Sequence, residues 1–255
     1  MCVIISIPNK ANVPTKEVLE QCETRNKDGG GIAWIKNNQV HWHKGVNLEA
    51  MLACLPEIPN ESPIVMHFRI ATAGGVSPEL CHPFPVTEDA PVALAGHGAS
   101  VLFHNGVWYR WEERMLDSVI SGNRQMPPGG WSDSRAMAYL AAHHGQDILS
   151  LINEKVVVLD SDGPGYYGRG WEKRGEVWFS NTHWDLTNFS YSWKHEMDAS
   201  KPKPKTRTRT KTKTRSGSLY LDSDRALLEE TQEHFLLRDD EPDLVEILGD
   251  DRRTR

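Results

Sequence analysis

The sequence predicts an α+β fold, a sandwich of strands and helices in one globular domain with an appended tail. Strand patterns dominate the first half of the chain, helical patterns are interspersed among them, and strand patterns return after residue 156. The 255 residues, of which 38% are hydrophobic, suffice for a sizeable core. A fibre or a fully disordered chain is therefore excluded.

Short runs of apolar and β-branched residues indicate the strands. We expect strands at 2–7, 31–35, 39–43, 64–69, 92–95, 100–104, 156–160 and 176–180. The Gly-rich stretch DGPGYYGRG (162–170), which separates the last two strands, is typical of a turn.

Apolar residues at helical spacing indicate four helices in the same region. They are expected at 15–25, 48–55, 111–121 and 132–143. The last is the clearest, because it begins at Ser132 and ends with His143 and His144 before Gly145.

Cysteine usage and hydropathy favour a cytoplasmic protein without membrane contact. No apolar run approaches the roughly 18 residues that cross a bilayer, and the opening MCVIISIPNK lacks the basic segment of a secretion signal. No CxxC pair occurs, so neither a zinc knuckle nor a disulfide framework is indicated. His41 and His43 share a strand face without an evident third ligand, so we predict no metal and no cofactor. The four cysteines are Cys2, Cys22, Cys54 and Cys81.

The charge distribution separates the tail from the rest of the chain. Residues 201–215, KPKPKTRTRTKTKTR, hold eight basic side chains and no acidic ones, and nothing in them suits a core. We interpret 196–217 as a basic disordered linker. It could make weak nucleic-acid contact through phosphates, or be attracted to acidic surfaces. The acidic tail at 218–255 has apolar residues at near-helical spacing, which indicates a short amphipathic helix. A second apolar cluster at 244–248, among carboxylates, resembles a peptide that docks on a partner.

Cys2 is a candidate nucleophile because it directly follows the initiator Met1. A small second residue permits removal of the methionine, which would leave Cys2 with a free α-amine. That amine titrates at about 8 and a thiol at about 8.5, so the amine can accept the thiol proton near neutrality. A cysteine at position 2 also occurs by chance, and the position alone does not establish catalysis.

Four segments follow Cys2 in an informative order. They are MHFRIATAGG (66–75), LCHPFPV (80–86), LFHNGVW (102–108) and WSDSRAMA (131–138). With them the chain resembles a class II glutamine amidotransferase domain, a member of the N-terminal-nucleophile hydrolase superfamily. The resemblance covers about residues 1–190 and implies a four-layer αββα sandwich. We therefore expect a domain at 1–195, followed by the disordered charged C-terminal tail.

The resemblance implies roles for three catalytic residues. Cys2 would attack the side-chain amide of glutamine, while the Asn105 amide and the Gly106 backbone N–H would stabilise the oxyanion. Asn-Gly is also the favoured pair for a tight hairpin turn, and both roles can coexist.

The resemblance also implies a binding site for a free amino acid. Arg69 would grip the α-carboxylate of glutamine, Thr72 would supply a nearby hydroxyl, and Asp133 would meet the α-ammonium group. The alternatives are an ordinary surface ion pair for Arg69 and a favourable charge at a helix N-terminus for Asp133.

Glutamine hydrolysis would supply ammonia to a separate acceptor synthase, since the residues after the domain are too few and too polar for a synthase domain. Ala73 stands where many members of the family have a histidine. An N-terminal-nucleophile amidase or peptidase acting on another amide therefore remains open. The charged tail also allows a non-catalytic binding protein.

Overall fold

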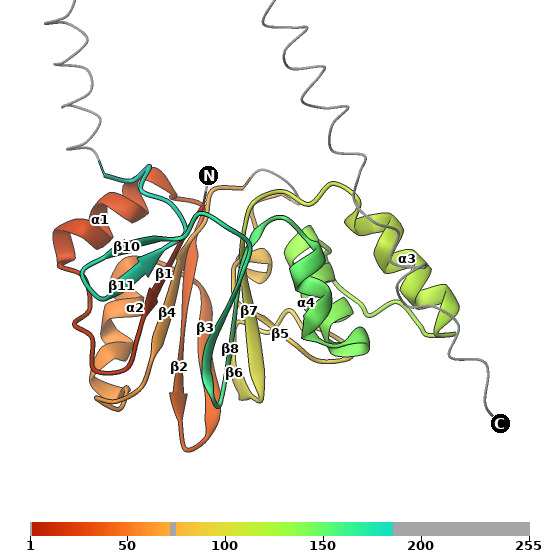
Figure 1. Ribbon diagram of the computed structural model, residues 1–255, viewed down its shortest axis with the longest axis horizontal. Coiled ribbons are helices and arrows are strands. Elements are labelled where there is room, and N and C mark those ends of the chain that lie inside the picture. The colour runs from red at the N-terminus through yellow and green to blue at the C-terminus, as the bar shows by residue number, and fades with distance from the viewer. Residues whose placement is uncertain (1, 72–74, 186–255) are drawn as a thin grey trace, which may run out of the picture. The chain divides into compact units, whose positions relative to one another are not determined.

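Two antiparallel sheets face each other, and helices cover the outer face of each sheet (Figure 1). The computed structural model describes residues 2–71 and 75–185. The expected α+β class is confirmed, and the described part has a helix–sheet–sheet–helix order of layers. The expectations for 196–217 and 218–255 lie outside the described residues.

Within the described residues, the larger sheet has seven strands in the order β10-β11-β1-β4-β2-β3-β6, and every neighbouring pair is antiparallel. Strand β1, with the sequence VIISI, is buried along its whole length and lies between β4 and β11. The strands are β1 (Val3–Ile7), β2 (Gly30–Lys36), β3 (Gln39–Val46), β4 (Ile64–Phe68), β6 (Ala95–Gly98), β10 (Glu172–Arg174) and β11 (Val177–Phe179).

The smaller sheet has, in the part of the chain that the structure describes, four strands in the order β5-β7-β8-β9, again all antiparallel. Its two central strands, β7 and β8, are apolar and almost entirely buried, as expected for strands covered on both faces. The strands are β5 (Phe84–Pro85), β7 (Ser100–Asn105), β8 (Lys155–Asp160) and β9 (Gly163–Tyr167).

Helices α1 and α2 pack on the seven-stranded sheet, and α3 and α4 lie on the side of the four-stranded sheet (Figure 1). Asn47 caps α2 by accepting a hydrogen bond from the backbone N–H of Ala50, and Ser132 caps α4 through the N–H of Arg135. The helices are α1 (Lys16–Arg25), α2 (Leu48–Cys54), α3 (Trp111–Ser121) and α4 (Asp133–His144). Short 3₁₀ turns are η1 (Leu55–Glu57), η2 (Pro78–Leu80) and η3 (Gln146–Leu151).

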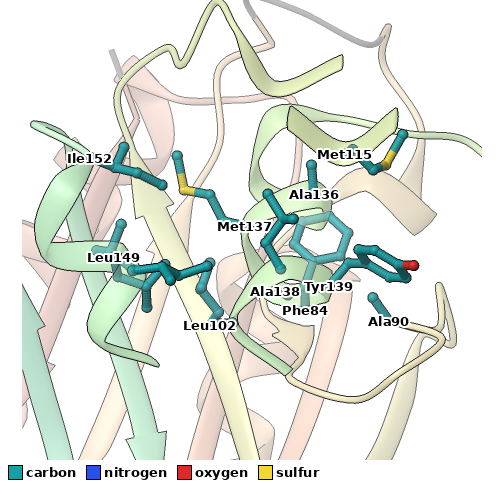
Figure 2. Packing of buried hydrophobic residues seen from close by; sticks show 14 of the residues in the cluster. Phe84, Ala90, Leu102, Met115, Ala136, Met137, Ala138, Tyr139, Leu149 and Ile152 are labelled. Atoms are coloured by element: carbon teal, nitrogen blue, oxygen red, sulfur yellow. The ribbon is translucent and has the colours of Figure 1, made fainter. Parts of the chain in front are cut away.

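Each interface between layers has its own apolar cluster. Alternation along β7 sends Leu102 toward the helices and Phe103 toward the other sheet. Figure 2 shows the helix side, where Leu102 packs with Met137 and Ala138 of α4. The cluster between the sheets consists of Ile4, Ala33, Val40, Trp42, Val65, Val101, Phe103, Val157 and Leu159.

One expected strand and one expected turn were wrong. The strand expected at 92–95 is found as β6, so only Ala95 belongs to both. The stretch 162–170, expected as a turn, contains the whole of β9. Among the strands that the structure describes, β9 lies at the edge of its sheet and pairs with β8 alone, and an edge tolerates the Gly and Pro residues that argue against a central strand.

Replacing Phe103 by alanine is expected to destabilise the fold by about 3–5 kcal/mol, because Phe103 is fully buried between the sheets and truncation leaves a cavity there. Urea unfolding measures the loss. Leu116→Ala on the exposed side of α3, where the side chain is 52% exposed, serves as the control and should change the free energy of unfolding by less than about 1 kcal/mol. Equal losses in the two variants would contradict this account of the core.

Candidate functional site at the start of strand β1

Cys2 lies immediately before β1 and is held on both sides. Its Sγ is 3.4 Å from the backbone N of Ile70 and 3.4 Å from the carbonyl O of the same residue. The Cys2 carbonyl accepts a hydrogen bond of 2.7 Å from Nδ2 of Asn181, in the segment that follows β11. The position of Cys2 is therefore set by the chain after β4 and the chain after β11.

Strand pairing places Arg69 beside Cys2. Val3 is paired with Phe68, so one step further in this register Cys2 faces Arg69. The Arg69 side chain is 4% exposed, and its Nη2 donates a 2.8 Å hydrogen bond to the carbonyl of Gly75. The structure thus brings together two of the residues expected in the site.

Burial is the largest influence on the Cys2 thiol, and it raises the pKa because a thiolate is poorly solvated in the interior. The backbone N–H of Ile70 and the positive charge of Arg69 lower the pKa, but each has a smaller effect. The Cys2 thiol is therefore protonated at neutral pH, and a reaction at its sulfur requires a base.

Asn105 ends β7, in the other sheet, and is connected to Cys2 through two consecutive residues. Its Nδ2 donates a 2.8 Å hydrogen bond to Oγ of Ser180, and the next residue, Asn181, binds the Cys2 carbonyl. Asn105 is 7% exposed. The patterns used for the sequence analysis missed Ser180 and Asn181, because a single Ser-Asn pair after a strand matches no motif.

Gly106 follows Asn105, but the two residues do not form a tight hairpin, because the chain continues from β7 into α3. Gly106 does not have a positive φ. A Cβ at this position would come within 1.9 Å of Oε2 of Glu154, so a larger residue would displace that side chain. The hairpin interpretation of Asn-Gly was wrong.

Asp133 lies on the helix side of the four-stranded sheet. It is the first residue of α4, and its carboxylate accepts hydrogen bonds from the backbone N of Trp108 at 3.1 Å and of Ser134 at 2.8 Å. His104 Nδ1 is 3.8 Å from Asp133 Oδ2. Because His104 and Asn105 alternate along β7, Asp133 contacts the face opposite to that of Asn105. Thr72 lies outside the described residues.

A row of polar residues crosses the seven-stranded sheet next to this site. Gly31 of β2 is paired with His67 on one side and with Lys44 on the other. The missing side chain of Gly31 leaves room for His82, since a Cβ on Gly31 would meet the His82 carbonyl O at 2.0 Å. The rings of His67 and His82 have centroids 4.0 Å apart.

Burial makes these bases weak. It lowers the pKa of His67 to about 3 and the pKa of Lys44 to about 7, because the charged forms lose their hydration. Lys44 is 1% exposed, and its Nζ lies 4.3 Å from the centroid of the Phe84 ring. In the sequence, His67 and Lys44 stand out only as polar residues within strands that are otherwise apolar or alternating. That pattern does not predict that they are buried.

In residues 2–71 and 75–185, no three His, Cys, Asp or Glu side chains are grouped so that they could hold a metal ion. None of the helices described in these ranges combines the length and apolarity needed to span a bilayer.

No protein-family model and no curated protein sequence matches the chain. Solved structures that are similar to it include glutamine phosphoribosylpyrophosphate amidotransferase from B. subtilis complexed with ADP and GMP, at 16% identity and a TM-score of 0.46. Another, described as the allosteric regulatory enzyme of purine biosynthesis, has 15% identity and a TM-score of 0.46. Each alignment covers 70% of this chain and 41% of the other, so the chain spans less than half the length of these proteins.

Lys44→Met is expected to stabilise the protein most at low and neutral pH. Lys44 binds its proton more weakly in the folded state, at a pKa of about 7, than in the unfolded chain, where the value is about 10.4. Its destabilising contribution is therefore complete below pH 7 and disappears as the pH rises toward 10. Arg135 lowers the Lys44 pKa further, whereas Cys81 and Glu79 act in the opposite direction.

Urea unfolding of Lys44→Met should show a gain on the order of 3 kcal/mol at pH 6 and a much smaller gain at pH 10. The exposed Lys27→Met is the control and should show no such pH dependence. A gain that is the same at both pH values would refute the proposed burial cost of Lys44.

Proposed function

We propose that the protein is an N-terminal-nucleophile hydrolase of the class II glutamine amidotransferase type, which hydrolyses the side-chain amide of glutamine. The main support is the placement of three residue types around the start of β1. The Cys2 thiol lies beside the Arg69 strand position, and Asn105 is connected to Cys2 through the Ser180–Asn181 pair. A nucleophile, a carboxylate ligand and an oxyanion donor are the groups that this reaction requires.

The reaction begins once Met1 is removed and Cys2 carries a free α-amine. The amine takes the thiol proton, and the sulfur attacks the carboxamide carbon of glutamine. The amide of Asn105 and the backbone N–H of Gly106 stabilise the negative oxygen of the tetrahedral intermediate. The nitrogen leaves as ammonia with the returned proton, and water then hydrolyses the γ-glutamyl thioester to glutamate.

Substrate recognition uses both charged ends of the amino acid. The guanidinium of Arg69 binds the α-carboxylate through paired hydrogen bonds, and we retain Thr72 as a hydroxyl ligand.

We retain Asp133 as the ligand of the α-ammonium group. It lies on the His104 side of β7, and its hydrogen bond from the backbone N of Trp108, three residues after Asn105, keeps it at the end of the strand where Asn105 lies. Its carboxylate accepts three hydrogen bonds, from the backbone N of Trp108 and from the backbone N and Oγ of Ser134, and the roughly four lone-pair sites of a carboxylate leave capacity for one more donor.

The ammonia is used by a separate acceptor synthase. In this proposal residues 1–195 are the catalytic domain, 196–217 are a basic linker, and the acidic segment 218–255 recruits the partner. Removal of 218–255 would weaken capture of that partner without reducing glutamine hydrolysis.

Cys2→Ala is expected to lower the rate of ammonia release from glutamine by at least about 10³-fold. The substitution removes the attacking sulfur but still permits removal of Met1. Ammonia assays measure this directly. A diazo ketone analogue of glutamine should add to Cys2, and the intact mass should also show the loss of Met1. Cys54→Ala, at a half-buried thiol on α2, is the control and should retain turnover and labelling. Full activity in Cys2→Ala, or activity only on acyl-amino acids or peptides, would reject the proposal.

Arg69→Lys is expected to raise KM for glutamine by about 10-fold or more, since lysine keeps the charge but loses the paired hydrogen bonds to the carboxylate. The kcat should change less than KM, because the carboxylate is bound equally in the ground and transition states. Arg69 also binds the Gly75 carbonyl, so thermal unfolding must show that the variant remains folded. An unchanged KM in the folded variant contradicts the assignment of Arg69.

A further inference from the structure

Ser180 is a fully buried residue that the mechanism above does not use. It follows β11, and its Oγ accepts two hydrogen bonds of 2.8 Å, one from the backbone N of Ile4 and one from Nδ2 of Asn105. Ile4 belongs to the seven-stranded sheet and Asn105 to the four-stranded sheet. One hydroxyl oxygen therefore joins the strand of the nucleophile to the candidate oxyanion donor.

The backbone explains why this hydroxyl is available. Ile5 is paired with Phe179, so Ile4 and Ser180 form the next pair, and the N–H of Ser180 donates to the Ile4 carbonyl at 2.9 Å. The reciprocal bond from Ile4 N goes to the Ser180 hydroxyl instead of its carbonyl. The Ser180 carbonyl binds Nζ of Lys155 instead, and Lys155 faces Asn105 across β7 and β8.

The geometry of an amide makes the contact with Asn105 directional. The NH₂ group of asparagine has two hydrogens in one plane, so a bond through one hydrogen fixes the direction of the other. Ser180 Oγ uses its acceptor capacity on Ile4 and Asn105, which holds the Asn105 amide in one orientation relative to β1. Because Asn181 binds the Cys2 carbonyl, two successive residues set the nucleophile and the oxyanion donor relative to each other.

We propose that Ser180 is a positioning residue for the oxyanion site, acting through Asn105, with Asn181 fixing the Cys2 end of the same unit. This inference rests on the proposed glutamine hydrolysis. The oxyanion exists only in the transition state and the intermediate, so misplacing its donor lowers kcat and leaves KM almost unchanged. Loss of a whole oxyanion donor reduces turnover by about 10²–10³-fold, and loss of its support should cost less, about 10- to 50-fold.

The test compares variants of the full-length, processed protein in glutamine hydrolysis. Ser180→Ala removes the acceptor, and Ser180→Cys replaces it by a weaker acceptor of similar size, so kcat should fall in the order wild type, Ser180→Cys, Ser180→Ala. Ser6→Ala is the matched control, because Ser6 is an equally buried serine of β1 whose hydroxyl binds Tyr166 OH at 2.7 Å. Its kcat should stay within about twofold of wild type.

A double-mutant cycle separates positioning from general loss of structure. In an Asn105→Ala background, Ser180→Ala should reduce kcat by less than about twofold further, because its effect passes through Asn105. The side-chain NH₂ resonances of Asn105, assigned by their absence in Asn105→Ala, should shift in Ser180→Ala and remain in place in Ser6→Ala. This second readout does not depend on turnover.

The outcomes distinguish this inference from the proposed function. If the wild-type protein releases no ammonia from glutamine, the proposed function fails and the catalytic role of Ser180 fails with it. If the wild type is active and both Ser180 variants keep its kcat, or if Ser180→Ala lowers kcat equally with and without Asn105, only the positioning role is overturned. Unshifted Asn105 resonances in Ser180→Ala overturn the structural coupling itself.

Discussion

Strand β1 is hydrogen-bonded on both sides, to β4 and to β11, and this double pairing fixes the position of Cys2, which precedes β1. The register with β4 sets Cys2 opposite Arg69, and the register with β11 sets Ile4 opposite Ser180. A shift of one residue would turn every side chain of β1 to the other face and separate Cys2 from both partners. The apolar faces of β1 resist such a shift, since Ile4 packs between the sheets while Val3 and Ile5 pack against the helices.

The polar row beside the site is accommodated by missing side chains. A Cβ at Gly29 would lie 2.7 Å from the Cys81 sulfur, and one at Gly31 would meet the His82 carbonyl. These two glycines allow the segment at 81–82 to lie close over β2, next to His67. Burial of these polar groups lowers the stability of the fold, and it leaves His67 uncharged at neutral pH, with a pKa of about 3. The interior beside Cys2 is therefore polar, and Arg69 is the strongly charged side chain in it.

Periodicity predicted most of the elements, because apolar runs such as those of β1, β4 and β8 have one stable placement in a two-sheet core. It failed where tertiary context overrides local preference, as in β9, where pairing with β8 makes a strand of glycine-rich sequence. Cys2, Arg69 and Asn105 could be selected as candidates from the sequence because each belongs to a recognisable segment. Ser180 could not, since its importance arises from contacts with residues 75 and 176 positions away.

The choice of base in the proposed reaction follows from the same burial. The Cys2 thiol has a raised pKa, so it needs a base stronger than a buried imidazole. His67 shares the face of Cys2, but with a pKa of about 3 it would not hold the proton. An arginine side chain does not serve as a base, and Lys44 lies at the far end of the polar row, beyond Gly31. None of these described neighbours is suited to accept the thiol proton. An α-amine on Cys2, for which the ordinary pKa is about 8, belongs to the same residue as the thiol.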